Sequence, residues 1–211
     1  MKQVDANSSL ETLHVIRSIM ERSTRFLTLS SWSGVWAGTT AIVGAYIAST
    51  LLEDDLLFSD KIQLETTVKF YQWLGLASAV FIIALLGAYF FTWRKAKISG
   101  GNLWSSASRT MLRTMALPMF AGALLCIGFL QNGHLIYIAP SCLIFYGLAL
   151  YNGGKYTLSE IQYLGLLEIL LGVICLFLPQ YGLYFWAAGF GVLHVLYGLI
   201  MWNKYEKGAN T

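Results

Sequence analysis

The chain has 211 residues, of which 56% are hydrophobic, 15% aromatic and only 12% charged. Soluble globular proteins carry roughly 25% charged residues, so this chain has too few ionisable side chains to cover the surface of a soluble domain. The composition also excludes disordered, collagen-like and disulfide-stapled chains. It predicts an all-α, polytopic membrane protein.

The first predicted element is an amphipathic helix over residues 8–25. Ser8 followed by Glu11 is a capping-box pattern, and apolar residues then recur at helical spacing, flanked by arginines. Two interpretations are open. The helix could lie on the cytoplasmic membrane surface with its basic groups against anionic lipid, or it could dock against the ends of the membrane spans.

Six apolar stretches follow, each near the roughly 20 residues that a bilayer-crossing helix needs. The stretches are continuous instead of alternating at every second residue, which favours helices over a β-barrel. We expect a cytoplasmic arm over 1–31, one transmembrane domain over 32–202 and a cytoplasmic tail over 203–211. The expected spans are 32–52, 68–92, 114–131, 134–152, 158–178 and 181–202.

Charge predicts the orientation of these spans. Twelve of the 14 Lys and Arg residues lie on the side that holds both termini, whereas five acids between Glu53 and Glu65 lie on the other side. By the positive-inside rule both termini are cytoplasmic, and an even number of spans requires the same arrangement. We therefore expect an N-in, C-in protein whose basic face meets anionic lipid.

Residues 94–109, between the second and third spans, have basic ends and a Gly100-Gly101 break. This composition predicts a flexible cytoplasmic connector whose Leu103 and Trp104 touch the membrane interface. Topology and lipid contact explain its basic residues, so we expect no nucleic-acid partner.

The last two spans share the pattern Gly-x-x-ionisable-x-x-x-Gly. It comprises Gly165, Glu168 and Gly172 in the fifth span and Gly191, His194 and Gly198 in the sixth. Positions i, i+3 and i+7 lie on one face of a helix, so the glycines allow another helix to pack closely beside each ionisable group.

Glu168 and His194 are expected at about 15 and 12 Å from the cytoplasmic surface, at 1.5 Å per helical residue. A lone charge at that depth costs several kcal/mol, so we expect the two to pair. The pair could be a proton-linked or cation-binding transport site, or one interhelical hydrogen bond that specifies packing. A water-accessible cavity at Glu168 would favour the first interpretation and a dry contact the second.

Polar residues nearer the cytoplasm could extend this centre, or each could be an interface anchor. They are Asn152, Tyr146, Tyr151 and Gln162.

Metal, haem and catalytic sites are not indicated. Cys126, Cys142 and Cys175 lie inside predicted spans without metal-ligand spacing and are interpreted as packing residues. Only one histidine, His194, is expected at mid-membrane, whereas a bis-His haem needs two. No catalytic motif occurs. We therefore expect no cofactor, no metal and no enzymatic activity.

Two further similarities bear on ancestry. Gln72-Trp-Leu-Gly-Leu in the second span resembles Gln162-Tyr-Leu-Gly-Leu in the fifth. If the two halves are repeats of three spans, they have inverted topology, as in many transporters. Separately, Glu21 to Gly34, running into Trp36-Ala37-Gly38, resembles the opening of small uncharacterised bacterial multi-pass membrane proteins. That resemblance covers mainly residues 10–50 and the six-span layout, and it implies a bacterial inner-membrane location without an activity.

The sequence therefore favours a small proton- or ion-linked transporter or channel centred on Glu168 and His194. The alternative is a non-transporting scaffold or sensor that acts on a partner through its basic cytoplasmic segments. The glycine faces of the first span, at Gly34 and Gly38, and of the sixth could form a homo-oligomer, unless they are used inside the chain.

Overall fold

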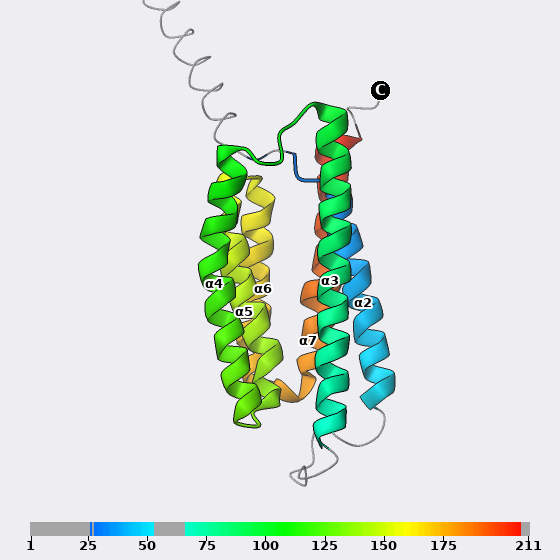
Figure 1. The fold of residues 1–211 in the computed structure, drawn as a ribbon, viewed down its shortest axis with the longest axis vertical. Coiled ribbons are helices and arrows are strands. Elements are labelled where there is room, and N and C mark those ends of the chain that lie inside the picture. Colours follow the sequence, from blue (N-terminus) through cyan, green and yellow to red (C-terminus); the bar gives the residue numbers. More distant parts are fainter. Residues whose placement is uncertain (1–25, 27, 53–65, 208–211) are drawn as a thin grey trace, which may run out of the picture.

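The structure is a computed structural model that describes residue 26 and residues 28–52 and 66–207 (Figure 1). The predictions for the amphipathic arm over 8–25 and for the acids between the first two spans fall outside these residues. All regular structure in the described part of the chain is helical. Six of its helical segments are long and apolar enough to cross a membrane. This confirms the prediction of an all-α bundle with six candidate membrane spans.

The first, second, third and fifth candidate spans are single helices, whereas the fourth and sixth include short 3-10 or π segments. The first three are α2 (Ser31–Leu52), α3 (Thr66–Ser99) and α4 (Ser106–Gln131). The fourth is η1 (Leu135–Tyr137), α5 (Ile138–Gly153) and η2 (Gly154–Tyr156), and the fifth is α6 (Ser159–Phe177). The sixth is η3 (Pro179–Tyr181), α7 (Gly182–Trp186), the π segment η4 (Ala187–Leu193), α8 (His194–Met201) and the π segment η5 (Trp202–Glu206).

The connector between α3 and α4 is shorter than the predicted 94–109 segment. The α3 helix continues to Ser99, and Gly100 then adopts a left-handed φ of 66°. The Gly101 N–H donates to the Ala96 carbonyl at 2.9 Å, which is the hydrogen bond of a Schellman ending. The prediction was wrong in extent because the charges that end an apolar run do not end a helix. Only residues 100–105 connect the two helices.

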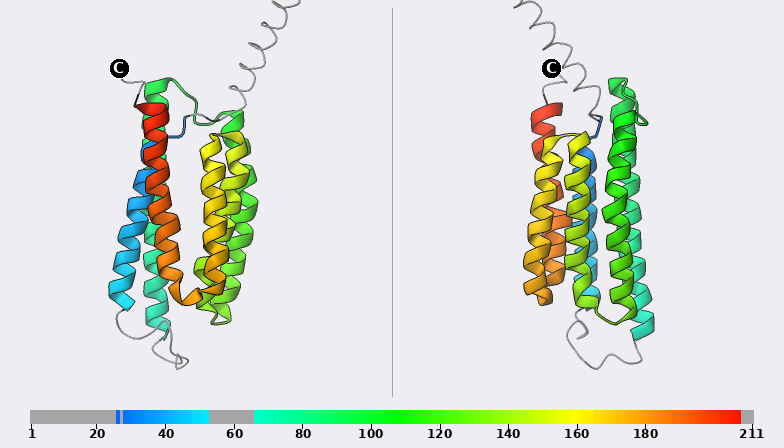
Figure 2. Two further views of the ribbon diagram at one scale, coloured as in Figure 1. Left: turned by 180° about the vertical axis from the view of Figure 1, so that it is seen from behind. Right: turned by 90° about the vertical axis from the view of Figure 1, so that its left-hand side faces the viewer.

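The spans form two three-helix groups, which Figure 2 shows side by side. In one group α2 packs against α3 and against α8 with η4; in the other α5 packs against α4 and α6. If spans one to three are matched in order with spans four to six, each neighbour pair has a counterpart. The pair α2 and α3 then corresponds to α5 and α6, and the pair α2 and α8 corresponds to α5 and α4. The halves contain three spans each and therefore run in opposite directions, so the packing follows the pattern of an inverted repeat.

Glycines allow backbones to touch within each group. A Cβ on Gly38 would lie 2.6 Å from the Gly191 carbonyl oxygen, and one on Gly147 would lie 2.6 Å from that of Gly165. Gly198 likewise packs against Val35 of α2. The glycine faces proposed for a homo-oligomer are thus used inside the chain, where they bring α2 onto the last span and α5 onto α6.

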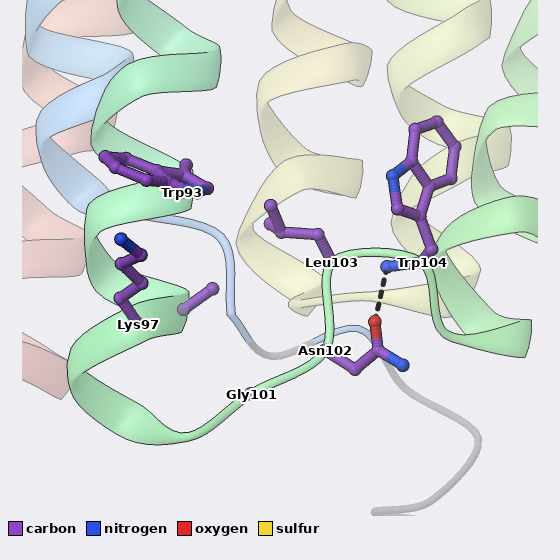
Figure 3. A pocket seen from close by; sticks show the side chains of 7 residues that line it. Trp93, Lys97, Gly101, Asn102, Leu103 and Trp104 are labelled. Atoms are coloured by element: carbon purple, nitrogen blue, oxygen red, sulfur yellow. Dashed lines mark hydrogen bonds between the residues drawn. The ribbon is translucent and has the colours of Figure 1, made fainter.

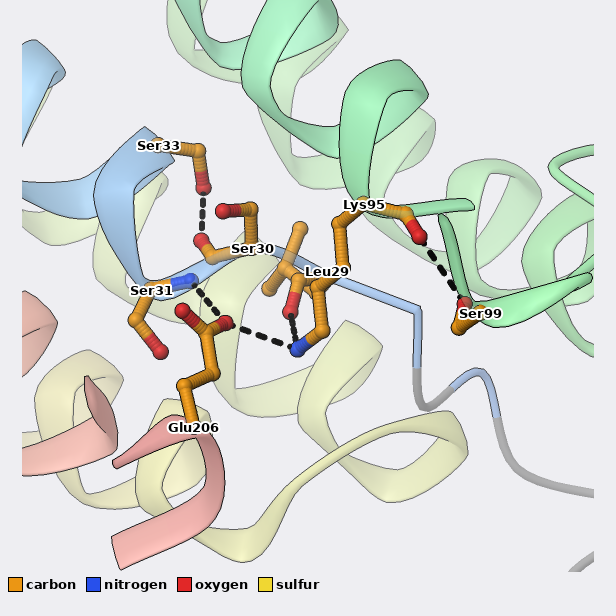
Figure 4. Close-up of polar contacts among 7 residues, drawn as sticks. All are labelled: Leu29, Ser30, Ser31, Ser33, Lys95, Ser99 and Glu206. Carbon is orange, nitrogen blue, oxygen red and sulfur yellow. Dashed lines mark hydrogen bonds and ion pairs between the residues drawn. The ribbon is translucent and has the colours of Figure 1, made fainter. Parts of the chain in front are cut away.

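One polar cluster joins the two described ends of the chain (Figure 4). Oε1 of Glu206 accepts a hydrogen bond from the Ser31 backbone N–H at 3.0 Å and lies 2.8 Å from Nζ of Lys95. Lys95 also donates to the Leu29 carbonyl at 2.8 Å. The start of α2, the end of α3 and the end of η5 therefore meet at one end of the bundle, as six spans require. We call this the basic end, because seven lysines and arginines lie there: Arg94, Lys95, Lys97, Arg109, Lys155, Lys204 and Lys207.

Candidate functional site

Three polar side chains meet halfway along their spans. Glu168 is the central residue of α6, nine residues from Ser159 and nine from Phe177. Tyr146 is near the middle of the span Leu135–Tyr156, and His194 begins α8 directly after the π segment. Because a helix rises about 1.5 Å per residue, Glu168 lies about 14 Å from either end of α6.

The structure brings Glu168 and His194 together, and Tyr146 completes the cluster. Nδ1 of His194 is 3.3 Å from Oε1 of Glu168 and 3.0 Å from the Gly189 carbonyl oxygen. On the other side of the ring, Nε2 is 2.9 Å from the Tyr146 hydroxyl. The Glu168 and Tyr146 side chains come from one three-helix group and His194 from the other, so the cluster lies where the groups touch.

The hydrogen-bond partners assign the tautomer of His194. A carbonyl oxygen only accepts, so Nδ1 carries the proton and donates it to Gly189. Nε2 is then free to accept from the Tyr146 O–H. Phe190 stacks against the imidazole, with ring centroids 6.2 Å apart and an interplanar angle of 24°, and holds the ring in this orientation. Both nitrogens of the His194 ring are therefore hydrogen-bonded.

The Glu168 carboxyl is enclosed but not satisfied. Its side chain has no exposed surface, and neither oxygen has a hydrogen-bond partner among the described residues. A Cβ on Gly189 would overlap Oε2 and would lie 2.5 Å from Leu143, so the carboxyl fills a space that a larger residue at 189 would close. A buried, unsatisfied polar group costs about 1–3 kcal/mol, and more when it is charged. Nδ1 of His194, 3.3 Å from Oε1, is the polar atom that lies beside this carboxyl.

The π segment η4 shapes this site, and sequence reasoning missed it. The imidazole of His194 reaches back five residues to the Gly189 carbonyl, and Gly189 and Gly191 are both buried within the segment. Single π turns inside α-helices occur often at functional sites. The available signal was the run of small residues in Ala187-Ala188-Gly189-Phe190-Gly191, but no periodicity rule converts such a run into a π turn.

The remaining predicted polar residues do not join the cluster. Asn152 Oδ1 accepts from Nζ of Lys155 at 3.5 Å, at the end of α5. Gln162 packs against Gly154 in the first turns of α6. Tyr151 is exposed, and Lys155 lies 5.5 Å from its ring centroid. Of the proposed extensions, only Tyr146 contacts His194.

The three cysteines lie outside this cluster, and no metal site is found among the described residues. Within residues 28–52 and 66–207, no group of three or more His, Cys, Asp or Glu side chains is arranged to hold a metal ion. Sγ of Cys126 on α4 is 3.8 Å from Sγ of Cys142 on α5, and Cys175 is buried on α6. All three cysteines are free thiols that pack between helices.

Fold and site together define a class: a multi-pass α-helical membrane protein with a buried Glu–His–Tyr cluster between two three-helix groups. Comparisons with protein-family models, with curated proteins and with solved structures each find no match for this chain.

Proposed function

We propose that this protein is a small proton-linked transporter in which Glu168 carries the proton and Tyr146 and His194 relay it. The observation that carries the proposal is the Glu168 carboxyl, fully buried at mid-span with both oxygens unsatisfied. Ionisable groups inside membrane spans are expensive and commonly mark proton or ion pathways. Transporters with inverted repeats bind substrates and coupling ions near the midplane, where the repeats meet.

The order Tyr146–His194–Glu168 supports a proton relay. The Tyr146 O–H proton passes to Nε2 of His194 while the Nδ1 proton passes to Oε1 of Glu168, across 2.9 and 3.3 Å. The imidazole stays neutral and ends in its other tautomer. A hydronium ion that reaches Tyr146 in an open conformation supplies a proton to the hydroxyl oxygen in the same step, so no free phenolate forms and a neutral water is left. The net result is one proton transferred to the Glu168 carboxylate.

Protonation of this cluster also provides coupling to a conformational change. The contacts of His194 with Glu168 and with Tyr146 both join one three-helix group to the other. An ionised Glu168 without hydrogen bonds is unstable in a closed, dry site, whereas a protonated one is tolerated. Proton loss therefore favours separation of the groups and entry of water, and proton gain favours closure.

Location and orientation belong to the same proposal. The clustering of basic residues at the end where both described termini lie supports a cytoplasmic basic end by the positive-inside rule. The resemblance of residues 10–50 to bacterial multi-pass proteins supports a place in a bacterial inner membrane.

A non-transporting scaffold or sensor is the second candidate, and one observation favours it. Glu168 is dry in the structure, and a dry contact with His194 is what a packing role requires. A packing role does not explain the two unsatisfied oxygens, because a structural hydrogen bond would satisfy at least one of them.

Two measurements on purified protein in liposomes distinguish these candidates. Proton flux is followed with an entrapped pH-sensitive dye, and thermal stability is measured on the same samples. Glu168→Gln is compared with Glu160→Gln, a control in the first turn of the same helix, where the carboxylate pairs with Lys204 at the basic end. The transporter proposal predicts flux in the parent and in Glu160→Gln, and none in Glu168→Gln, which keeps the parent's stability. A parent without proton flux, together with a destabilised Glu168→Gln variant, would establish the packing role instead.

A further inference from the structure

An open pocket lies at the basic end, where α3 runs into the connector to α4 (Figure 3). Its volume is about 370 Å³, within the range of small-molecule sites. The residues that line it are Trp93, Ala96, Lys97, Gly101, Asn102, Leu103 and Trp104. The pocket is separate from the Glu168 cluster, which lies halfway along the spans.

Local hydrogen bonds and contacts hold the walls of this pocket. The left-handed Gly100 turns the chain at the end of α3, and Gly101 packs so closely against Thr28 that a Cβ would overlap its methyl group. Oδ1 of Asn102 then accepts from the Trp104 N–H at 2.9 Å, an Asx turn that orients the indole-bearing residue. Ser105 caps α4 by accepting from the Ser108 N–H. The pocket is therefore built into the fold by its connector.

The lining combines one cation with two indole rings. Nζ of Lys97 lies 4.2 Å from the centroid of the Trp93 ring. Among the described residues that line the pocket none is acidic, whereas the neighbouring Lys95 is paired with Glu206. Lys97 is thus the cationic group that faces a ligand here, and its chemistry selects an anion.

The surroundings select a lipid over a soluble anion. Trp104, which lines the pocket, is 65% exposed, and Ile98, which follows Lys97 in the chain, is 79% exposed. Phe90, which is half-exposed one turn before Trp93 on α3, continues the aromatic surface toward the middle of the span, with ring centroids 6.4 Å apart. Tryptophan and lysine at the end of a membrane span lie at the level of the lipid headgroups. An anion bound here would carry an apolar portion that covers these side chains.

We propose that this pocket binds the phosphate-bearing headgroup of an anionic phospholipid. Lys97 meets the phosphate, Trp93 and Trp104 flank the headgroup, and an acyl chain runs along Phe90. A bound lipid would hold the end of α3 against the connector and against the segment that enters α2.

Binding is tested with the full chain in detergent micelles, to which phosphatidylglycerol or phosphatidylcholine is added. The readouts are the melting temperature and the number of lipids retained in native mass spectrometry. We expect phosphatidylglycerol to be retained and to raise the melting temperature, and phosphatidylcholine to do neither. Lys97→Gln should weaken phosphatidylglycerol binding about five-fold, equivalent to the roughly 1 kcal/mol that one lysine contributes at an anionic surface. Lys97→Arg should restore binding.

Lys207→Gln is the matched control, since Nζ of Lys207 lies 5.8 Å from the Trp202 ring at the same end but outside the pocket. It should bind phosphatidylglycerol as the parent does. Equal weakening by Lys97→Gln and Lys207→Gln would overturn the proposal in favour of a diffuse basic surface. Equal stabilisation by inorganic phosphate or glycerol phosphate would also overturn it, in favour of a soluble anion. Neither result depends on proton transport by Glu168.

Discussion

Oε1 of Glu168 lies 3.3 Å from Nδ1 of His194, yet the imidazole N–H is directed to the Gly189 carbonyl, 3.0 Å away. The carboxyl is therefore next to a donor that is already engaged. A shift of the His194 proton from Gly189 to Glu168 requires only a small motion of one ring. The Nδ1 proton therefore has two acceptors within reach, and the proposed relay depends on this competition.

Removal of the Tyr146 hydroxyl should interrupt the relay while the fold is kept. Tyr146→Phe leaves Nε2 of His194 without its donor, and the loss of one neutral hydrogen bond should cost about 1 kcal/mol of stability. We expect proton flux in liposomes to fall strongly. Tyr163→Phe is the control, because Tyr163 is 66% exposed on α6 and should retain parental flux. Parental flux in Tyr146→Phe would remove the tyrosine from the relay.

Gly189 should tolerate no side chain, because its Cα faces the Glu168 carboxyl. Gly189→Ala forces the new Cβ against Oε2 of Glu168 and against Leu143, and overpacking of this kind costs about 1–3 kcal/mol. Thermal unfolding in detergent should show the loss. Gly75→Ala is the matched control in α3, since nothing lies within 4 Å of a Cβ there, and it should be neutral or stabilising. Equal melting temperatures for the two variants would contradict the packing described for Glu168.

The sequence predicts much of this arrangement and omits specific parts of it. Continuous apolar runs locate the six spans, and the paired glycine patterns indicate Glu168 and His194 because small residues flank each ionisable group. Tyr146 is less clear in the sequence, since tyrosine occurs as often at interfaces as in sites. The His194–Gly189 contact depends on a π turn, which leaves no periodic trace. The predicted connector 94–109 was too long at both ends. The α3 helix ends before Gly100 and α4 begins after its N-cap Ser105, and neither boundary falls at the charges that flank the apolar runs.

Oxidation of neighbouring thiols tests the packing of α4 against α5. The Sγ atoms of Cys126 and Cys142 are 3.8 Å apart and need to approach to about 2.05 Å to form a disulfide. A mild thiol oxidant should therefore form an intramolecular Cys126–Cys142 bond, which mass spectrometry of a digest detects. A Cys175→Ser variant should form the same bond. Dominant pairing of Cys175 with either other cysteine would contradict this helix arrangement.

The cluster at the basic end should contribute to stability. Glu206→Gln removes the negative charge that holds Lys95 and the first N–H of α2, and the partly exposed pair should cost about 1 kcal/mol. The melting temperature should fall, and it should fall less at high salt because salt already weakens the pair. Lys207→Gln, at the same end, should leave it unchanged. A melting temperature of Glu206→Gln equal to that of the parent would show that the cluster does not hold the ends of α2 and α3.

The proposed gain and loss of a proton by Glu168 inside the bundle can be observed by infrared difference spectroscopy of the protein in lipid. Spectra taken between acidic and alkaline buffer separate the C=O band of a buried protonated carboxyl from carboxylate bands. We expect such a band in the parent and in Glu160→Gln, and its loss in Glu168→Gln. A spectrum of Glu168→Gln that is identical to that of the parent would contradict it.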